Sequence, residues 1–169
     1  MVDAEQSYTQ LAIESITEQL QLKYNRKRAY ILPTIQNYLK RSTIRADYEV
    51  RFCQAHNLKF GAKLVRGAYL VEETELAEKE GRENPVVDCF EDTTSNYLGS
   101  FERMVSSVEE GEVIVATHNQ DTVEDVIAIK AKYKKTPQVG FAQLLGLADH
   151  LTAKLNSEGW RVYKYLPWA

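Results

Sequence analysis

Strand-like and helix-like segments alternate along the whole chain, and this alternation is the strongest constraint on its fold. Short apolar runs that are typical of strands cover Met1–Ala4, Tyr30–Ile35, Lys59–Val65, Glu112–Ala116, Gln138–Phe141 and Arg161–Tyr165. The segments between them carry apolar residues at helical spacing. Repeated strand–helix units predict a parallel sheet covered by helices. We therefore predict an α/β fold, with residues 1–169 in a single domain.

Apolar residues about four positions apart indicate which face of each helix meets the core. The sets are Leu11, Ile16, Leu20 and Tyr24; Ile44, Tyr48, Phe52 and Ala55; Phe90, Tyr97, Phe101, Met104, Val105 and Val108; and Leu147, Leu151 and Leu155. A further helix begins at Asp121, with acidic residues in its first turn.

Two ways of closing the sheet are compatible with this pattern, an open doubly wound sheet and a (β/α)8 barrel. Neither a GxGxxG motif nor a P-loop is present, which argues against a nucleotide-binding open sheet. Polar residues follow the apolar runs at Asp3–Glu5, Gln36–Tyr38, Arg66–Tyr69, Thr117–Asn119, Gln143 and Tyr165. In a barrel these positions meet at the carboxyl ends of the strands, where such enzymes do chemistry. The barrel is therefore the preferred prediction.

Both ends of the chain fall at strand-like runs. We expect about six of the eight barrel strands to be present, with the first two strands before Met1 and the last helix after Ala169.

The run Phe60–Leu70 contains the clearest candidate ligand surface. Lys63, Val65, Gly67 and Tyr69 share one parity, so in a strand they line one face. A cation and an aromatic ring on either side of a bare stretch of backbone suit a flat, electron-rich ligand. The alternative is a buried strand whose ends are polar.

Composition excludes several classes of protein. The net charge is −3, and the sequence has no basic stripe with interleaved aromatic residues. We therefore do not expect nucleic-acid binding. No apolar run is long enough to span a membrane. Cys53 and Cys89 have no metal-ligand spacing, so we predict free thiols and no metal site.

Six motifs, in the same order along the chain, resemble motifs of the proline dehydrogenase family. Their residues are more similar to those of the mitochondrial eukaryotic enzymes than to those of the bacterial bifunctional ones. The motifs are Asp3-Ala-Glu-Gln6, Ile35-Gln-Asn-Tyr38, Lys63-Leu-Val-Arg-Gly-Ala-Tyr69, Ala116-Thr-His-Asn119, Gln143-Leu-Leu-Gly146 and Tyr163-Lys-Tyr-Leu-Pro167. The resemblance implies a proline dehydrogenase barrel that oxidises L-proline to Δ1-pyrroline-5-carboxylate, the first step of proline catabolism to glutamate. It also implies FAD as cofactor, quinone as electron acceptor, and peripheral association with the matrix side of the mitochondrial inner membrane.

The resemblance also implies which residues contact the cofactor. Lys63 matches the basic residue beside the flavin N5 edge, and its alternative is a lysine stem lying on apolar surface. The remaining cofactor contacts are Gln36, Val65, Gly67, Thr117, His118, Asn119 and Gln143. For His118 we favour a ligand role over a general base, because hydride transfer from a neutral amine requires none.

The substrate contacts follow from the same resemblance. Tyr69 and Leu145 match residues that wall the small ring, Tyr165 matches the phenol that packs on it, and Asp3 matches the carboxylate that orients this phenol. The predicted catalytic residues are Lys63, Tyr165 and Asp3. Plain core packing is the alternative for Tyr165. Relatives that prefer 4-hydroxyproline carry a smaller residue there, so the resemblance implies proline.

Some departures leave other functions open. The family's arginine pair and first-strand lysine have no match in this chain, Ala169 stands where a glycine is usual, and Asp88-Cys89 replaces Pro-Thr. The alternatives are a hydroxyproline dehydrogenase, and a truncated inactive chain that acts as a binding or assembly module. A weaker one is an aldolase-like barrel in which Lys63 forms a Schiff base.

Overall fold

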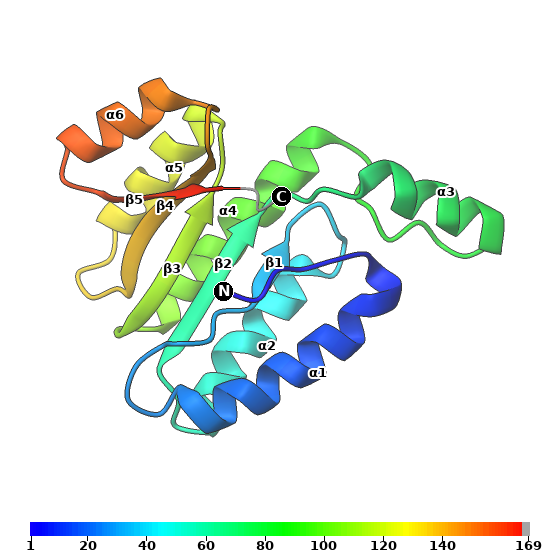
Figure 1. The fold of residues 1–169 in the computed structure, drawn as a ribbon, viewed down its shortest axis with the longest axis horizontal. Helices are drawn as coiled ribbons and strands as arrows, with labels where there is room; N and C mark the ends of the chain where they lie inside the picture. Colours follow the sequence, from blue (N-terminus) through cyan, green and yellow to red (C-terminus); the bar gives the residue numbers. More distant parts are fainter. Residues whose placement is uncertain (167–169) are drawn as a thin grey trace.

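The computed structural model describes residues 1–166, which form a five-stranded parallel sheet with helices packed around it (Figure 1). The strands are β1 (Thr34–Gln36), β2 (Phe60–Val65), β3 (Gly111–Ala116), β4 (Gln138–Leu144) and β5 (Arg161–Tyr165). Their order across the sheet is their order in the chain, and each neighbouring pair is parallel. The predicted α/β fold with a parallel sheet is confirmed.

The helices are α1 (Ser7–Tyr24), α2 (Ser42–Ala55), α3 (Leu70–Glu80), α4 (Phe90–Ser107), α5 (Gln120–Ala131) and α6 (Asp149–Ser157). Figure 1 shows α3, which follows β2 and precedes α4 in the chain, projecting from the body of the molecule. Within residues 1–166, no helix combines the length and the apolar character that a membrane span requires.

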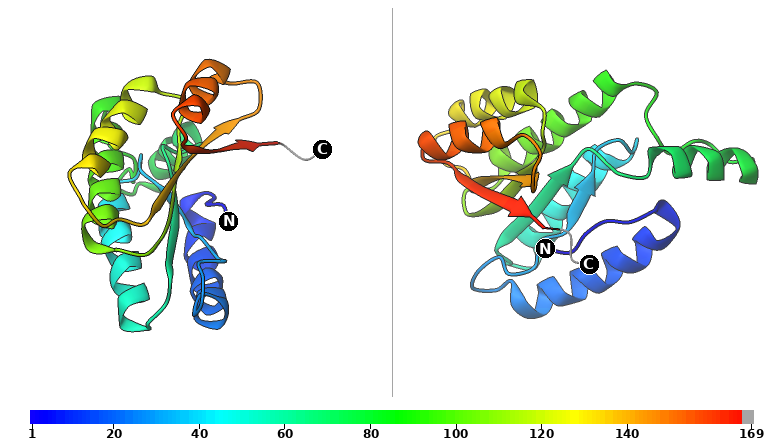
Figure 2. Two further views of the ribbon diagram at one scale, coloured as in Figure 1. Left: turned by 90° about the vertical axis from the view of Figure 1, so that its left-hand side faces the viewer. Right: turned by 45° about the horizontal axis from the view of Figure 1, so that its top comes forward.

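The main core lies on the helix-covered side of the sheet, where α2, α4 and α5 run beside one another (Figure 2). Ala62 and Leu64 of β2 point into this core, together with Val113 and Val115 of β3. Strand alternation places the intervening residues on the opposite side. We call this opposite side the inner face; it carries Gly61, Lys63, Val65, Ile114, Ala116, Gly140 and Ala142.

A loop covers the end of the inner face where the strands begin. Ala29 and Leu32 of this loop pack against Ile114 and Ala142. A Cβ atom on Gly61 would lie 2.8 Å from the Leu32 side chain, so this close approach requires glycine. The loop therefore leaves the other end of the inner face, at the strand carboxyl ends, as the open one.

The prediction of a first strand at Met1–Ala4 is wrong. Met1–Ala4 contributes a single parallel bridge, Val2 to Pro33, beside β1. The next predicted strand is also shorter than expected, because the Asn25 side chain bonds the Tyr30 and Ile31 backbone at 2.7 to 3.0 Å. Those backbone groups are therefore not available for a strand ladder.

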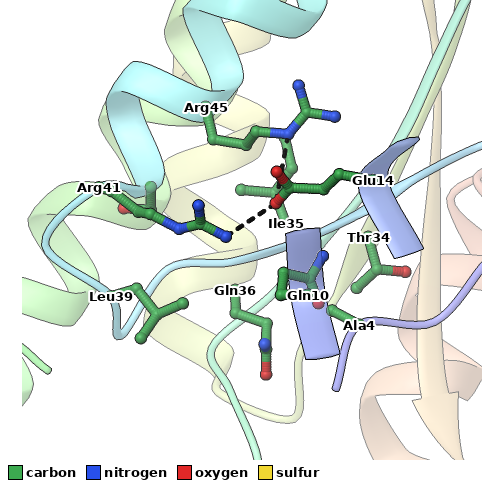
Figure 3. A pocket seen from close by; sticks show the side chains of 10 residues that line it. Ala4, Gln10, Glu14, Thr34, Ile35, Gln36, Leu39, Arg41 and Arg45 are labelled. Carbon is green, nitrogen blue, oxygen red and sulfur yellow. Dashed lines mark hydrogen bonds and ion pairs between the residues drawn. The ribbon is translucent and has the colours of Figure 1, made fainter. Parts of the chain in front are cut away.

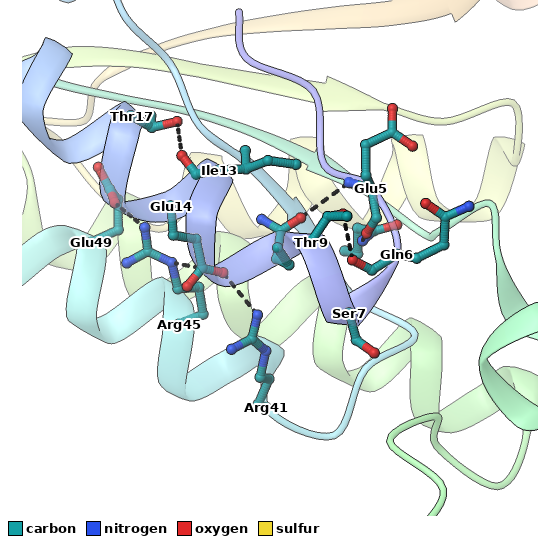
Figure 4. A network of polar contacts seen from close by, with 12 residues as sticks. Glu5, Gln6, Ser7, Thr9, Ile13, Glu14, Thr17, Arg41, Arg45 and Glu49 are labelled. Carbon is teal, nitrogen blue, oxygen red and sulfur yellow. Dashed lines mark hydrogen bonds and ion pairs between the residues drawn. The ribbon is translucent and has the colours of Figure 1, made fainter. Parts of the chain in front are cut away.

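The predicted apolar faces of α1 and α2 are also wrong. Leu11 and Ile16 are 68% and 59% exposed, while the buried residues of α1 are Gln10, Thr17 and Gln21. Ile44 and Tyr48 of α2 are likewise exposed. The cause in α1 is a polar contact with α2, shown in Figure 4, in which the two helices meet through carboxylates and arginines. In α2 the residues that meet the core are Ala46, Val50 and Cys53, and of the predicted set only Phe52 packs against them.

The predicted faces of α4 and α6 are largely confirmed. Tyr97, Phe101, Met104 and Val105 are buried in α4, and Leu151 and Leu155 are buried in α6. Phe90 and Leu147, at the edges of those two patterns, are exposed.

Candidate active site

The predicted site residues gather where the parallel strands end. Gln36 closes β1, Lys63 lies near the end of β2, and Tyr165 closes β5. Thr117, His118 and Asn119 follow β3 directly, and Gln143 is the next-to-last residue of β4. Parallel pairing brings these five strand ends to one edge of the sheet, as the sequence pattern predicts.

Lys63 is a buried lysine held by an acid. Its side chain is 10% exposed and forms an ion pair with Asp3, whose own side chain is 46% exposed. Thr34 is the register neighbour of Lys63, and its buried hydroxyl has no hydrogen-bond partner among residues 1–166. The cation therefore stands on the inner face, as its parity predicts, paired with a predicted catalytic carboxylate.

Small side chains follow Lys63 along the inner face. Val65 is in register with Gln36, and Ala116 is in register with Ala142. None of these three apolar side chains projects far from the sheet. These short side chains make a flat patch on the sheet between Lys63 and the carboxyl ends of β4 and β5. A planar ring system can lie on such a patch.

Gly67 has a packing role in this structure. Its φ is +138°, and a Cβ atom would lie 1.8 Å from the Tyr38 ring, so no other residue fits without rearrangement. Burial raises the pKa of Tyr38. The Tyr38 ring thus packs directly against the Gly67 backbone, two residues before Tyr69.

Glu5 joins two of the predicted site residues, and the sequence analysis gave it no role. Its carboxylate accepts a hydrogen bond from the Tyr69 hydroxyl, and its backbone carbonyl accepts one from Gln36 Nε2 at 2.8 Å. The hydrogen bond to Glu5 raises the pKa of Tyr69 to about 12. The sequence signals for Glu5 are its place in the polar run Asp3–Glu5 and in the motif Asp3-Ala-Glu-Gln6.

Thr117, His118 and Asn119 build the turn between β3 and α5. The Thr117 hydroxyl accepts the Asn119 N–H at 3.1 Å, and the Asn119 side chain caps α5 by accepting the Thr122 N–H at 2.7 Å. His118 Nε2 accepts the Leu144 N–H at 2.9 Å, so the neutral ring carries its proton on Nδ1. Desolvation, with a smaller effect of Lys164, lowers the pKa of His118 and favours this neutral form.

Two nitrogen donors near the strand ends are buried and lack partners among residues 1–166. One is Gln143 Nε2; the oxygen of the same amide accepts from Thr152. The other is Arg66 Nε, which the sequence analysis did not assign. The Arg66 guanidinium lies 4.2 Å from the Phe90 ring centroid and donates to Thr94, the fifth residue of α4, and to Thr122, in the first turn of α5. Burial lowers the pKa of Arg66.

Tyr165 and Leu145 lie side by side at the end of the β4–β5 pair. The Leu145 N–H donates to the Tyr165 carbonyl at 3.0 Å. Tyr165 is 49% exposed, so its ring is not part of the core of residues 1–166. No hydrogen bond joins Asp3 to Tyr165 within the described residues, where Asp3 instead binds Lys63. The predicted difference at Ala169 lies outside those residues.

A small polar pocket lies between α1, β1 and α2 (Figure 3). Arg41 and Arg45 both reach Glu14 there, at 2.9 and 3.6 Å. Of the predicted ligand contacts, it includes only Gln36. We therefore assign this pocket to the contact between α1 and α2. Separately, residues 1–166 contain no group of three or more His, Cys, Asp or Glu residues that could hold a metal ion.

Comparison with known proteins gives consistent matches over the whole chain. The family model described as proline dehydrogenase matches residues 1–169. "Proline dehydrogenase 1, mitochondrial" of Caenorhabditis elegans is 38% identical over 176 residues, which cover 99% of this chain and 29% of that protein. "Hydroxyproline dehydrogenase" of Xenopus laevis is 33% identical over 175 residues, covering 99% of this chain and 38% of that protein.

A solved structure supports the same fold. The crystal structure of proline utilization A from Bdellovibrio bacteriovorus has a TM-score of 0.91 and 24% identity, covering 98% of this chain and 17% of that one. The matched proline dehydrogenase domains are barrels, in agreement with the predicted closure. The chain spans about a third of the length of the curated relatives that it matches.

Proposed function

Because this chain belongs to the proline dehydrogenase family, we propose that it supplies the cofactor-binding and substrate-binding face of an enzyme that oxidises L-proline. The product is Δ1-pyrroline-5-carboxylate, and quinone accepts the electrons. The observation that carries the proposal is the buried cation Lys63 on a floor of small side chains, surrounded by predicted ligand contacts from all five strand ends.

The inner face and its edge fit an FAD molecule. Val65 and Ala116 are short, partly exposed side chains that leave room for a flat ring beside Lys63. Gln143 Nε2 and Arg66 Nε are buried donors with no partner among residues 1–166, and a cofactor would satisfy both. When bound, FAD supplies the hydride acceptor that proline oxidation requires.

Each residue has a role that follows from its place. Lys63 brings a positive charge to the inner face, where it favours negative charge on a bound ring. Arg66 lies near the amino ends of α4 and α5, bound to Thr94 and Thr122, and adds a guanidinium to them, an arrangement that suits a phosphate group. His118 offers Nδ1–H as a hydrogen-bond donor. Val65, Gly67, Thr117 and Asn119 shape the backbone that these side chains depend on.

The proposed substrate site lies at the same edge of the sheet. Tyr69, Leu145 and Tyr165 wall the small ring, and Asp3, bound to Lys63, adds a carboxylate at its border. A bulky phenol at position 165 crowds an added hydroxyl group, which favours proline over hydroxyproline. Hydroxyproline oxidation is the second candidate, because one relative at 33% identity is named a hydroxyproline dehydrogenase.

The proposed cellular site is the matrix side of the mitochondrial inner membrane, where quinone is available. Its support is that the matching proline dehydrogenases are named mitochondrial. Fractionation of cells that express the tagged protein tests this location, and recovery outside the mitochondria contradicts it.

The test of the activity is an absorbance spectrum of the protein with added FAD, before and after anaerobic L-proline. We expect a protein-bound flavin band that bleaches with proline. A bound flavin that does not bleach contradicts the activity but not the cofactor site. The absence of bound flavin contradicts both, and favours a binding or assembly module.

Two matched lysine variants test whether the bleaching depends on the inner face. Lys63→Met should abolish the bleaching, because it removes the buried cation. Lys59→Met is the control: Lys59 precedes the same strand but pairs with Glu110 at the surface. Equal bleaching in both variants rules out a role for Lys63, and borohydride trapping with a carbonyl substrate tests the alternative Schiff-base lysine.

A further inference from the structure

The geometry points to Glu5 as a positioning residue that holds Tyr69 and Gln36 in place at the substrate end of the site. This inference rests on the proposed function, and it extends that function to a residue to which the sequence analysis gave no role. Glu5 acts through the two side chains that it binds.

Glu5 makes one contact with each of three separate parts of the chain. Its N–H donates to the Gln10 side chain of α1 at 3.0 Å, and its carbonyl accepts from Gln36 of β1 at 2.8 Å. Its carboxylate accepts from Tyr69, 64 residues away in the sequence. Gln10 and Gln36 are both buried, so neither amide has water as a ready substitute partner.

Among residues 1–166, only the hydrogen bond with Tyr69 uses the Glu5 side chain. The bonds to Gln10 and Gln36 use the backbone of Glu5, so they survive a substitution at this position. A change of the carboxylate therefore tests the orientation of Tyr69 while Gln36 and α1 stay anchored.

Two further contacts, one on each side of Glu5, join the N-terminal segment to the rest of the chain, and one of them provides a control. Asp3 pairs with Lys63 on one side of Glu5, and on the other side the Ser7 hydroxyl donates to Glu73 of α3 at 2.6 Å. Glu73 is a buried carboxylate that holds the same segment to the same part of the chain. Its backbone N–H donates to the Tyr69 carbonyl at 2.9 Å, but its carboxylate binds Ser7 and not the Tyr69 hydroxyl, so a side-chain substitution at Glu73 leaves that hydroxyl's contact intact. It therefore matches Glu5 in chemistry and in structural role.

Loss of the charged acceptor frees the Tyr69 ring. Hydrogen bonds to charged groups are stronger than neutral ones, and a ring that is no longer held must be ordered when substrate binds. The expected cost appears in substrate binding, because Tyr69 walls the substrate and takes no part in hydride transfer. The raised pKa of Tyr69 is a second signature of the same contact.

The experiment compares Glu5→Gln, Tyr69→Phe, the double variant and Glu73→Gln. We expect Glu5→Gln to raise KM for L-proline about tenfold with kcat changed less than about threefold. Tyr69→Phe should do the same, and the double variant should be no worse than either single one, because both remove one contact. Glu73→Gln should lower stability without this change in KM.

A titration that needs neither flavin nor turnover separates this inference from the proposed function. Fluorine NMR of protein labelled with 3-fluorotyrosine, with the resonance assigned by Tyr69→Phe, reports the pKa of Tyr69. We expect Glu5→Gln to lower that pKa by about one unit, and Glu73→Gln to leave it unchanged. An unchanged Tyr69 pKa in Glu5→Gln, or an equal rise of KM in Glu73→Gln, overturns the inference even if the enzyme is active. If the enzyme is inactive, the titration alone decides.

Discussion

Helices α1 and α4 each contain 18 residues, but they pack against the rest of the molecule by different chemistry. α4 buries Tyr97, Phe101, Met104 and Val105 against the sheet. α1 buries Gln10, Thr17 and Gln21, and leaves Leu11 and Ile16 exposed. The difference shows that helix α4 is held by apolar area, whereas α1 is held by specific polar partners.

The polar contact of α1 depends on a few groups on α2. Arg45 lies within 3.6 Å of Glu14 and Glu18 and within 3.1 Å of Glu49, and Gln21 bonds Glu49 at 2.5 Å. Such contacts have strict geometry, and removal of one partner leaves another buried without compensation. By contrast, α4 spreads its stabilisation over many weak contacts, and one of its side chains also reaches the site edge. The Tyr97 hydroxyl lies 3.1 and 3.2 Å from the Leu64 and Ala116 carbonyls.

The largest expected effect is in α4. Phe101→Ala should destabilise the protein by about 3–5 kcal/mol, because it removes a fully buried ring and leaves a cavity against the sheet. Urea unfolding followed by circular dichroism measures this loss. A loss below about 1 kcal/mol would show that the α4 core repacks readily.

An intermediate effect, dependent on pH, is expected in the network that holds α1. Burial raises the pKa of Glu49, against the opposing effects of Arg45 and Gln21, so the folded protein holds this proton more tightly than the unfolded chain does. Stability should therefore fall as pH rises from the ordinary carboxyl pKa through the raised value. Glu49→Gln should flatten this trend, measured as the urea midpoint between pH ~4.5 and ~7.

The control for Glu49 is an exposed acid. Glu110→Gln changes a carboxylate whose pKa is lowered by Lys59, so its own trend has the opposite direction. The falling trend should therefore persist in this variant. Its disappearance there would assign the trend to surface charge and not to the contact between α1 and α2.

The smallest expected effect is on the exposed side of α1. Ile16→Ala, matched in kind to Phe101→Ala, should change the free energy of unfolding by less than about 0.5 kcal/mol, because Ile16 is mostly exposed. The same urea titration measures it. A loss above about 1 kcal/mol would mean that this side of α1 is covered in solution.

The same contrast explains which parts of the fold the sequence predicts. Apolar periodicity identified α4 and the strands β2 to β5, because in those segments local pattern and core packing agree. It failed for α1, because the partner of Gln21 lies 28 residues away and no local pattern encodes that pairing. It failed for Met1–Ala4, because a single bridge at the edge of β1 is too little for a strand.

The candidate site shows the same division. The order of the strands brings Gln36, Lys63, His118, Gln143 and Tyr165 to one edge, and topology alone predicts this. The sequence did not reveal the partner of each side chain, because Asp3 and Lys63 are 60 residues apart and Glu5 and Tyr69 are 64 residues apart. Arg66 went unassigned for the same reason, since its partners Thr94 and Thr122 become neighbours only when α4 and α5 are packed.

The strand order has a consequence for how the sheet assembles. Each strand after β1 pairs with the strand that immediately precedes it in the chain, so the sheet can grow during synthesis in the direction of translation. One helix connects each pair, except that α3 and α4 both lie between β2 and β3. The three middle strands are then protected on both sides, while β1 and β5 have one ladder each. Amide hydrogen exchange should therefore be slowest in β2, β3 and β4 and should quicken toward both edges.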